Sequence, residues 1–555
     1  MSDTLHIPRD RLVFIPLGGA GEIGMNVYLY GYAGKWLMID LGITFHDDVI
    51  PTINVVLPDL RFIEEQSRNL LGLVVTHGHE DHLGAIPYLW PRLKCPVYAT
   101  PFAAALINSK TPEILAPQRV PVSEIPLGHR FDLGPFDLEL VTLTHSIPEP
   151  NAVILRTPAG TVVHSGDWKF DPYPMIGPVA DVGSLRRAGR EGVLALIGDS
   201  TNVFVSGRSG SESMVRDGLI DLVGDYTGRI AVTCFASNVA RVESIAEAAV
   251  RNGRQVALVG RSLWRVVEAA RSVGYLADAP RFLTDEKAKH LPADKVLYIC
   301  TGSQGEPRSA LAKIASRTHP CVSLGAGDVV IFSSRVIPGN EKAIFHLQNQ
   351  LARQGVAVVT DRDHMVHVSG HPARGEMEEM YALLRPRIAI PIHGEMRHLT
   401  EHARLAKACG VPDVVVVENG EAVALSQEGA QGIGQVPVGR LAVDGLRLEP
   451  WDSEILRSRR RLIYNGVAVV TVVVDRSGLL VGDPLLSAPG LLDPVAEPDA
   501  QERVIEAVRY ALHRVPAGSR REDESLRSAV RLAVRRSLRE SHGVKPLTEV
   551  HLVRL

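Results

Sequence analysis

LLGLVVTHGHEDH, residues 70–82, passes from a continuous apolar stretch into a short segment that contains three histidines, a glutamate and an aspartate. An apolar run of this length predicts a buried strand. The strand is followed by four candidate ligands, His77, His79, Asp81 and His82. Imidazole and carboxylate groups at this spacing can direct two side chains at one metal ion and two at a second ion. The stretch therefore predicts a two-metal site on the loop between a strand and a helix.

Two single residues elsewhere in the sequence occupy similar positions. His145 follows the β-rich segment LELVTLT, and Asp167 follows TVVHSG. Each residue alone would more often have a structural role. Because both follow strands that can end at the same sheet edge as the cluster at residues 77–82, we expect both side chains to join it as metal ligands.

Short β-rich segments bounded by turn residues recur between residues 12 and 198. The stretches YLYGYAGKWLMID and VILRTPAGTVVHSGD are typical of hairpins that turn at Ala-Gly. Helix candidates between these segments are fewer. This part of the chain predicts an α/β fold with considerable antiparallel sheet.

The pattern changes after about residue 207, where SGRSGSESMV supplies a Gly/Ser-rich boundary. Beyond it, strands and helices alternate, as expected of a βαβ domain with a parallel sheet. Strand-end histidines return in DHMVHVSGH and IAIPIHGE. The predicted organisation is a first domain at 1–207 that resumes at 357–430, an insertion at 208–356, a linker at 431–462 and a small C-terminal domain at 463–555.

The overall composition is ordinary for a folded protein with several domains. Hydrophobic residues make up 45% and charged residues 22% of 555 positions, and the net charge of −3 does not indicate a polyanion partner. Any nucleic-acid surface must therefore be local.

The five cysteines form no C-x-x-C pair, which suits a reducing compartment. Since neither a secretory leader nor an apolar span of about 18 residues is found, we expect a cytoplasmic protein without membrane association.

The spaced motifs resemble those of a known superfamily. Asp40 after KWLMI, the H-x-H-x-D-H run, His145 and Asp167 are similar to the successive motifs of the metallo-β-lactamase superfamily. Further along the chain, LIGDSTN, HVSGH and PIHGE resemble the three additional motifs of its β-CASP nucleases, with the key residues Asp199, His371 and His393. Together with PLGGAGEIGMNVYLYG and the C-terminal extension, these motifs resemble the ribonuclease J family over essentially the full length.

The resemblance implies an α/β fold: an αββα metallo-β-lactamase sandwich, an inserted parallel α/β β-CASP domain and a small α+β C-terminal domain. It also implies two divalent metal ions per subunit, with Zn²⁺ as the first expectation and Mn²⁺ or Mg²⁺ as alternatives. The implied ligands are His77, His79 and His145 for one ion, Asp81, His82 and His393 for the other, and Asp167 as a bridge. Asp40 would orient the ligands from the second shell.

A hydroxide shared by the two metal ions is the implied nucleophile for attack on a phosphodiester. The residues expected to take part in catalysis are Asp81, His82, Asp199 and His371. A carboxyl-imidazole pair such as Asp199 and His371 could deliver a proton to the leaving 3′-oxygen. The resemblance also places His367, Ser369 and His371 around a substrate phosphate, so the sequence leaves both acid catalysis and positioning open for His371.

The function implied by the resemblance is a metal-dependent 5′-to-3′ exoribonuclease that prefers single-stranded RNA with a 5′-monophosphate and also has endonuclease activity. Such an enzyme would act in RNA processing, rRNA maturation and mRNA decay. A homo-oligomer, either a dimer or a tetramer, and membership of an RNA-degradation assembly are the further partners that we expect.

Three other functions are alternatives to this hypothesis. A small-ester or thioester hydrolase of the same fold would need neither the insertion nor the HVSGH segment. A catalytically silent RNA-binding scaffold would have lost metal ligands, whereas this sequence retains all of them. In the DNA-directed branch of the β-CASP nucleases, the last motif is expected to have Val where this sequence has His393.

The stretch GGAGEIG satisfies the G-x-G-x-x-G pattern of dinucleotide-binding loops at Gly19, Gly21 and Gly24. A dinucleotide loop opens a helix whose N-terminus holds the pyrophosphate. Here the loop continues into the β-rich segment MNVYLYG. The context therefore argues against NAD binding.

Two loops of the insertion and two arginine groups have less specific patterns. TGSQGEPRSAL (301–311) and SSRVIPGNE (333–341) each follow an apolar strand and could present N–H groups to phosphate. The resemblance would place both loops along an RNA channel, while ordinary βα connections remain an equal alternative.

The arginines are Arg457, Arg459, Arg460 and Arg461 in the linker and Arg527, Arg531, Arg535, Arg536 and Arg539 near the C-terminus. The spacing of the second group favours a solvated helix face opposite Leu526, Val530 and Val534.

Overall fold

The structure is a computed structural model that describes residues 7–45, 50, 52–115, 119–493 and 495–555. The chain divides into two compact units, Met1–Thr44 with Leu57–Gly439 and Phe45–Val56 with Arg440–Leu555. Residues 1–6, the start of the stretch in which no leader was found, lie outside the described residues. None of the helices in the described part of the chain has the length and apolar character needed to cross a membrane.

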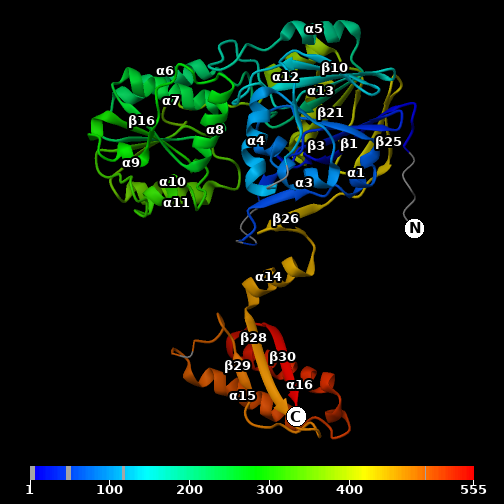
Figure 1. The fold of residues 1–555 in the computed structure, drawn as a ribbon, viewed down its shortest axis with the longest axis vertical. Coiled ribbons are helices and arrows are strands. Elements are labelled where there is room, and N and C mark those ends of the chain that lie inside the picture. Colours follow the sequence, from blue (N-terminus) through cyan, green and yellow to red (C-terminus); the bar gives the residue numbers. More distant parts are fainter. Residues whose placement is uncertain (1–6, 46–49, 51, 116–118, 494) are drawn as a thin grey trace. The chain divides into compact units, whose positions relative to one another are not determined.

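Two sheets stack face to face in the first unit, with one apolar core between them (Figure 1). The first sheet has the order β25 (Gly429–Gln435), β24 (Glu421–Ser426), β1 (Leu12–Gly18), β3 (Val27–Tyr32), β4 (Lys35–Ile39), β7 (Leu70–Val74), β8 (Val97–Ala99) and β9 (Val122–Glu124). The second has the order β10 (Arg130–Leu133), β11 (Phe136–Thr142), β12 (Asn151–Thr157), β13 (Gly160–His164), β14 (Ala195–Asp199), β21 (Ile388–Ile392) and β23 (Asp413–Val414). Phe14 and Tyr30 from the first sheet and Leu138 from the second are fully buried in this core.

Strand pairing follows the hydrophobic pattern of the sequence. The antiparallel pairs β3–β4 and β12–β13 confirm both predicted hairpins. In the same second sheet, β13, β14 and β21 are parallel neighbours. The long segment between β14 and β21 therefore leaves and re-enters the sheet at adjacent strands.

Helices cover the outer faces of both sheets (Figure 1). α5, α12 and α13 cover the second sheet, where Leu185, Met380 and Ala406 belong to one apolar cluster with its outer side chains. α4 contacts β8 and β9 of the first sheet and packs beside α3. The αββα sandwich is thereby confirmed. The helices of this part are α1 (Arg61–Glu65), α2 (Glu80–Leu83), α3 (Ile86–Leu93), α4 (Pro101–Leu115), α5 (Val182–Glu191), α12 (Arg374–Leu384) and α13 (Met396–Ala408).

The segment between β14 and β21 forms a six-stranded sheet whose paired strands are all parallel. Its order is β17 (Leu283–Thr284), β16 (Gln255–Val259), β18 (Val296–Cys300), β15 (Ile230–Thr233), β19 (Val329–Phe332) and β20 (Ala357–Val359). Helices cover both of its faces, and Figure 1 shows α6 and α7 opposite α10 and α11. The helices are α6 (Glu212–Gly224), α7 (Val239–Arg251), α8 (Arg261–Ser272), α9 (Asp285–Ala288), α10 (Ala310–Ala315) and α11 (Glu341–Ala352). This domain confirms the predicted parallel α/β insertion, and its last strand extends to Val359.

The second unit contains a small α+β domain. Its sheet places β28 (Val467–Val474) between β29 (Leu485–Ser487) and β30 (Leu547–Arg554). Apolar side chains of α15 (Pro498–His513) and α16 (Asp523–His542) share one core with β28. Leu526, Val530 and Val534 are buried in that core while Arg535 and Arg536 are exposed, so α16 has the solvated arginine face that the spacing predicted.

The segment expected as a linker, 431–462, has regular structure over much of its length. It contains the hairpin of β26 (Arg440–Asp444) and β27 (Arg447–Pro450) and most of α14 (Glu454–Asn465). The hydroxyl of Ser453 accepts a hydrogen bond from the N–H of Leu456 and caps α14. The chain passes between the units through β5 (Thr44–Phe45) and β6 (Val55–Pro58).

The alternation along β28 predicts a difference between adjacent valines, because Val472 is buried and Val473 is partly exposed. We expect Val472→Ala to lower the free energy of opening of this domain by about 2 kcal/mol, through lost burial and a cavity. Val473→Ala is the matched control and should cost less than about 1 kcal/mol. Hydrogen exchange of peptides from β28 and β30 measures both values, and equal losses would contradict the register.

Candidate functional site

The predicted site residues follow the ends of strands in both sheets of the sandwich. β4, β7, β11, β13, β14 and β21 end at or shortly before Asp40, His77, His145, Asp167, Asp199 and His393 respectively. The remaining ligand candidates of the first motif continue from the β7 loop into α2. The structure thus brings together side chains from residues 40 to 393 at one rim of the sandwich.

One group of potential ligands consists of His77, His79, His145 and Asp167, whose ligand atoms all lie within 4.8 Å of one another. Nδ1 of His79 lies 3.1 Å from Nε2 of His77 and 3.0 Å from Nε2 of His145. Ligand atoms around a tetrahedral zinc ion are about 3.3 Å apart, because each Zn–N bond is about 2.0–2.1 Å long. The spacing of this group therefore fits one such ion.

A second group consists of Asp81, His82, Asp167 and His393, again with ligand atoms within 4.8 Å of one another. Oδ2 of Asp167 lies 3.2 Å from Nε2 of both His82 and His393. Oδ2 of Asp81 lies 3.6 Å from the same two nitrogens. Since Asp167 belongs to both groups, the geometry fits two ions that share one carboxylate.

The hydrogen bonds behind the imidazoles show why cations fit between them. Nδ1 of His145 donates to the carbonyl of Gly370 at 2.6 Å, and Nδ1 of His82 donates to Oδ2 of Asp40 at 2.7 Å. A neutral ring that donates from Nδ1 has its lone pair on Nε2. These Nε2 lone pairs point into the cluster, where a metal ion would neutralise their mutual repulsion.

Asp40 lies behind the ligands, at the position expected of an orienting carboxylate. Its Oδ1 accepts the N–H of Thr76 at 2.8 Å, and its Oδ2 accepts the Thr76 hydroxyl at 2.8 Å. Because that hydroxyl proton is used, Thr76 Oγ1 can accept from Nδ1 of His77, which lies 3.0 Å away. Asp40 and Thr76 together orient His77 and His82.

Burial keeps three of the histidine ligands in the neutral form that binds metal, whereas Asp167 outweighs burial and raises the pKa of His82 and His393, so that a metal ion would displace a proton from those two rings. Burial lowers the pKa of His77 and His79 well below the ordinary value, and that of His145 to about 3. These rings are therefore neutral, as ligation requires. Burial alone would raise the pKa of Asp167, but the adjacent imidazoles of His393, His82 and His371 hold it well below its usual range.

Asp199 and His371 form a pair beside the ligands. Oδ2 of Asp199 accepts from Nδ1 of His371 at 2.8 Å, while Oδ1 accepts the N–H and hydroxyl of Thr201 at 2.9 and 2.7 Å. Burial opposes the charged ring, but Asp199 and Asp167 outweigh it and raise the pKa of His371 to about 9. The pair can hold a proton within reach of the ligand cluster.

The HVSGH segment lies between that pair and the insertion. Nδ2 of Asn202 donates to Oγ of Ser369 at 2.6 Å and to the carbonyl of His371 at 3.1 Å. His367 is partly exposed at the other end of the segment, near Arg241. Asn202 and Gly370, which hold this segment and His145, were missed because an amide and a backbone carbonyl give no sequence signal for a site.

The G-x-G-x-x-G stretch has a structural role next to the ligands. The carbonyl of Gly19 accepts the N–H of His393 at 2.6 Å, and β2 (Ala20–Gly21) pairs with β22 (Gly394–Glu395). Gly19, Gly21 and Gly24 have φ between 80° and 91°, a conformation that other residues rarely adopt. β3, and not a helix, comes next after this stretch, in line with the argument against dinucleotide binding.

The two insertion loops at 301–311 and 333–341 lie against each other. Nε2 of Gln304 donates to the carbonyl of Arg335 at 2.9 Å, and its Oε1 accepts the N–H of Ile337 at 3.0 Å. Both loops follow parallel strands, β18 and β19, and so lie at one edge of the sheet.

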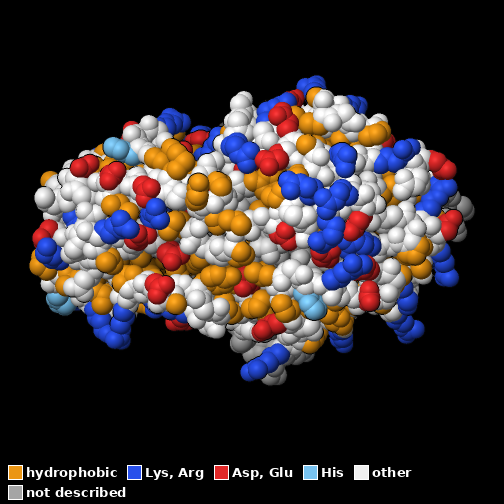
Figure 2. Space-filling view, turned by 90° about the horizontal axis from the view of Figure 1, so that it is seen from above, with side chains coloured by type: hydrophobic (Ala, Val, Ile, Leu, Met, Phe, Trp, Pro, Cys, Tyr) orange, Lys and Arg blue, Asp and Glu red, His pale blue; other side chains and the backbone are white. Residues whose placement is uncertain are grey.

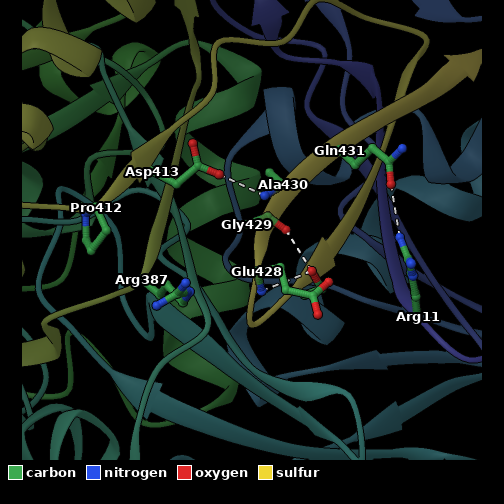
Figure 3. A pocket seen from close by; sticks show the side chains of 9 residues that line it. Arg11, Arg387, Pro412, Asp413, Glu428, Gly429, Ala430 and Gln431 are labelled. Carbon is green, nitrogen blue, oxygen red and sulfur yellow. Dashed lines mark hydrogen bonds between the residues drawn. The ribbon is translucent and has the colours of Figure 1, made fainter.

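A surface cavity of about 430 Å³ lies away from the ligands, between edge strands of the two stacked sheets (Figure 3). Its lining includes Arg11, Arg387, Asp413 and Glu428, and no predicted site residue. Asp413 accepts the N–H of Ala430 and so joins the two edges. Figure 2 shows groups of Lys and Arg side chains on one face of the molecule, with Asp and Glu side chains among them.

Profiles of known families match successive parts of the chain. They are the metallo-beta-lactamase superfamily at residues 20–200, the ribonuclease J beta-CASP domain at 227–351, the Zn-dependent metallo-hydrolase RNA specificity domain at 355–417 and the ribonuclease J C-terminal domain at 454–555. The ribonuclease J of Sinorhizobium meliloti is 44% identical over 98% of this chain and 98% of its own. The chain belongs to the ribonuclease J family.

Other ribonucleases J match over similar lengths. Those of Mycobacterium tuberculosis and Thermus thermophilus are 39% and 36% identical, over 96% and 97% of this chain and 95% of their own chains. A solved structure from Enterococcus faecalis, described as a protein of unknown function, has a TM-score of 0.52 and 16% identity over 75% of this chain and 100% of its own. That likeness supports the fold alone.

Membership of the family establishes the class of enzyme. This ribonuclease J family member is a hydrolase that binds metal and acts on RNA, as its domains indicate. The predicted class of enzyme, fold and type of substrate are confirmed. The cluster of imidazoles and carboxylates fits a dinuclear metal site.

We expect Asp167→Asn to lower the metal content from about two ions to at most one ion per chain, because the only carboxylate common to both ligand groups loses its charge. Elemental analysis of the purified, metal-loaded protein measures the ratio. Asp132→Asn, an exposed position on β10, is the matched control and should keep two ions. Two tightly held ions in Asp167→Asn would show that Asp167 does not join the sites.

Proposed function

We propose that this ribonuclease degrades single-stranded RNA in the 5′-to-3′ direction from 5′-monophosphate ends, and that it also cleaves internally. The proposal rests mainly on the HVSGH segment, which joins the ligand cluster to the insertion. At one end, the carbonyl of Gly370 accepts from His145 at 2.6 Å. Directly before its other end, the carbonyl of Val366 accepts from the hydroxyl of Ser333, next to the end of β19, at 2.7 Å. RNA held by both domains would be cut at a fixed distance from its end.

The insertion offers groups that suit a terminal phosphate. The loops at 301–311 and 333–341 follow parallel strands and lead into α10 and α11, and Ser309 caps the N-terminus of α10. Helix starts and loop N–H groups favour anions. A 5′-monophosphate carries more negative charge than an internal phosphodiester, so loops of this kind would favour it over an internal site.

The proposed ligands are His77, His79 and His145 for one ion and Asp81, His82 and His393 for the other, with Asp167 between them. When bound, the ions would supply a water of lowered pKa and offset the charge that gathers on the phosphate oxygens. Asp40 and Thr76 orient the ligand rings. His367, Ser369 and His371 would bind a substrate phosphate.

The pair of Asp199 and His371 would hold the proton that the leaving 3′-oxygen needs. Asp199 lies 2.8 Å from Nδ1 of His371 and favours its protonated form. His371 is also close to the ligands, since its Nδ1 lies 3.8 Å from Oδ2 of Asp167. Asp81 and His82 would act in catalysis as ligands.

The cellular role follows from this activity as part of the proposal. Zinc is the preferred metal because imidazole and carboxylate ligands at this spacing suit it, with manganese or magnesium as alternatives. All five cysteines are free thiols, which suits the cytoplasm. We infer roles in RNA processing, rRNA maturation and mRNA decay, as a dimer or tetramer and within an RNA-degradation assembly.

Three RNAs that differ only in their 5′ ends test the proposed polarity. We expect rapid mononucleotide release from the 5′-monophosphate RNA and at least about tenfold slower release from 5′-triphosphate and 5′-hydroxyl RNA, since a tenfold ratio of rates corresponds to about 1.4 kcal/mol of activation free energy. Asp81→Ala with His82→Ala should abolish release. Equal rates on all three ends would refute end recognition, and faster hydrolysis of a thioester would favour a small-ester hydrolase.

Asp199→Asn tests the role of the Asp199 and His371 pair. The change keeps the shape but removes the charge that holds the His371 proton, so we expect kcat to fall about 10²-fold or more. The metal content should stay at that of the wild type. An RNA with a sulfur leaving atom at the 3′ position needs no proton and should restore most of the rate. No rescue would assign the pair to positioning alone.

A further inference from the structure

Arg241 of α7 is the largest fully buried side chain of the described chain. Its Nε donates to Oε2 of Glu212 at 3.1 Å and its Nη2 donates to Oε1 at 3.0 Å. Glu212, at the start of α6, is buried as well. A two-bond pair of this kind fixes both the position and the plane of the guanidinium.

The third nitrogen of the guanidinium is directed at the HVSGH segment. Nη1 of Arg241 lies 2.8 Å from both the carbonyl and the hydroxyl oxygen of Ser333, beyond the end of β19. It also lies 3.1 Å from the carbonyl of Val366 and 3.4 Å from Nδ1 of His367. One buried cation therefore connects the insertion sheet with the segment that carries His367.

The position of Nη1 restricts the tautomer of His367. Nη1 of Arg241 can only donate and lies 3.4 Å from Nδ1 of His367, so a proton on that ring nitrogen would face the protons of the guanidinium. The proton of the neutral ring is then on Nε2, on the opposite side. The cations Arg241, Arg335 and Lys169 add to the effect of burial, and the pKa of His367 lies well below its ordinary value.

We propose that Arg241 is a positioning residue for RNA binding, which holds residues 366–367 at the end of the insertion sheet and fixes His367 as the Nε2–H tautomer. The inference rests on the proposed function, in which His367 contacts a substrate phosphate. A neutral ring in this tautomer offers one N–H donor, which a phosphate oxygen accepts. Glu212 balances the buried charge and keeps the guanidinium in place.

A merely structural ion pair would have a different signature. If the pair of Arg241 and Glu212 only joined α6 to α7, its loss would lower stability and leave the RNA affinity of the folded fraction unchanged. A positioning role changes KM for RNA, leaves kcat near its original value, and acts through His367. These differences define the test.

The test is a double-mutant cycle of Arg241→Lys and His367→Ala in the full, metal-loaded chain, assayed on a 5′-monophosphate RNA. Lysine keeps the charge beside Glu212 but lacks the fork that reaches Ser333 and Val366. We expect each single variant to raise KM about tenfold with kcat within about threefold, and the double variant to be no worse than His367→Ala. Arg251→Lys, an exposed pair with Glu247 on the same helix, is the matched control and should change neither.

A second measurement keeps the inference separate from the proposed function. Nitrogen NMR of histidine-labelled protein, with His367 identified from the spectrum of His367→Ala, reports the tautomer without any RNA. We expect the Nε2–H tautomer of His367 in the wild type and a mixture of both tautomers in the double variant Arg241→Gln with Glu212→Gln. This double variant removes both buried charges together, and it replaces Arg241→Lys if that variant does not fold. Additive effects on KM, or Nδ1–H in the wild type, would overturn the inference. Absence of RNA cleavage by the wild type would instead overturn the proposed function.

Discussion

The close packing of buried imidazoles around the carboxylate of Asp167 sets the main constraint on this fold. Oδ2 of Asp167 lies 3.2 to 3.8 Å from the ring nitrogens of five histidines, which come from four separate segments of the chain. Three of these rings are held from behind: His82 by Asp40, His77 by Thr76 and His145 by Gly370. Asp40 and His393 have φ of 61° and 53°, a strained conformation that the surrounding hydrogen bonds maintain. The sandwich keeps these strand ends in register.

The sequence predicted the features that depend on local pattern. His77, His79, Asp81 and His82 follow an apolar strand within one short segment, and two hairpins followed from their alternation around Ala-Gly turns. The parallel insertion followed from the alternation of strands and helices. Contacts between distant segments were not predictable, because Gly370 and Asn202 contribute through a carbonyl and an amide that occur throughout any protein. The helix in the expected linker was missed because the basic run indicated a linker, although Ser453 caps a helix there.

The HVSGH segment combines functions that the sequence shows only as neighbouring letters. Gly370 orients a ligand ring, His371 pairs with Asp199, and Val366, directly before the segment, accepts from Ser333 of the insertion. A Cβ at Gly370 would lie 2.6 Å from Nδ1 of His145, so only glycine fits there. The choice of residue at position 370 is therefore as restricted as that of a metal ligand, because the backbone of Gly370 is in direct contact with the ring of His145.

The insertion is a single connection between β14 and β21, which are adjacent parallel strands. The connection therefore leaves the carboxyl end of β14 and returns to the amino end of β21, one strand position across and about 13 Å back along the sheet, whatever the length of the chain between them. A module attached in this way can be enlarged, shortened or exchanged during evolution without changing the register of the sheet that carries the ligands. The same geometry would let different nucleic-acid shapes be served by one hydrolytic centre, and it offers protein engineers a natural site for replacing the substrate-binding part.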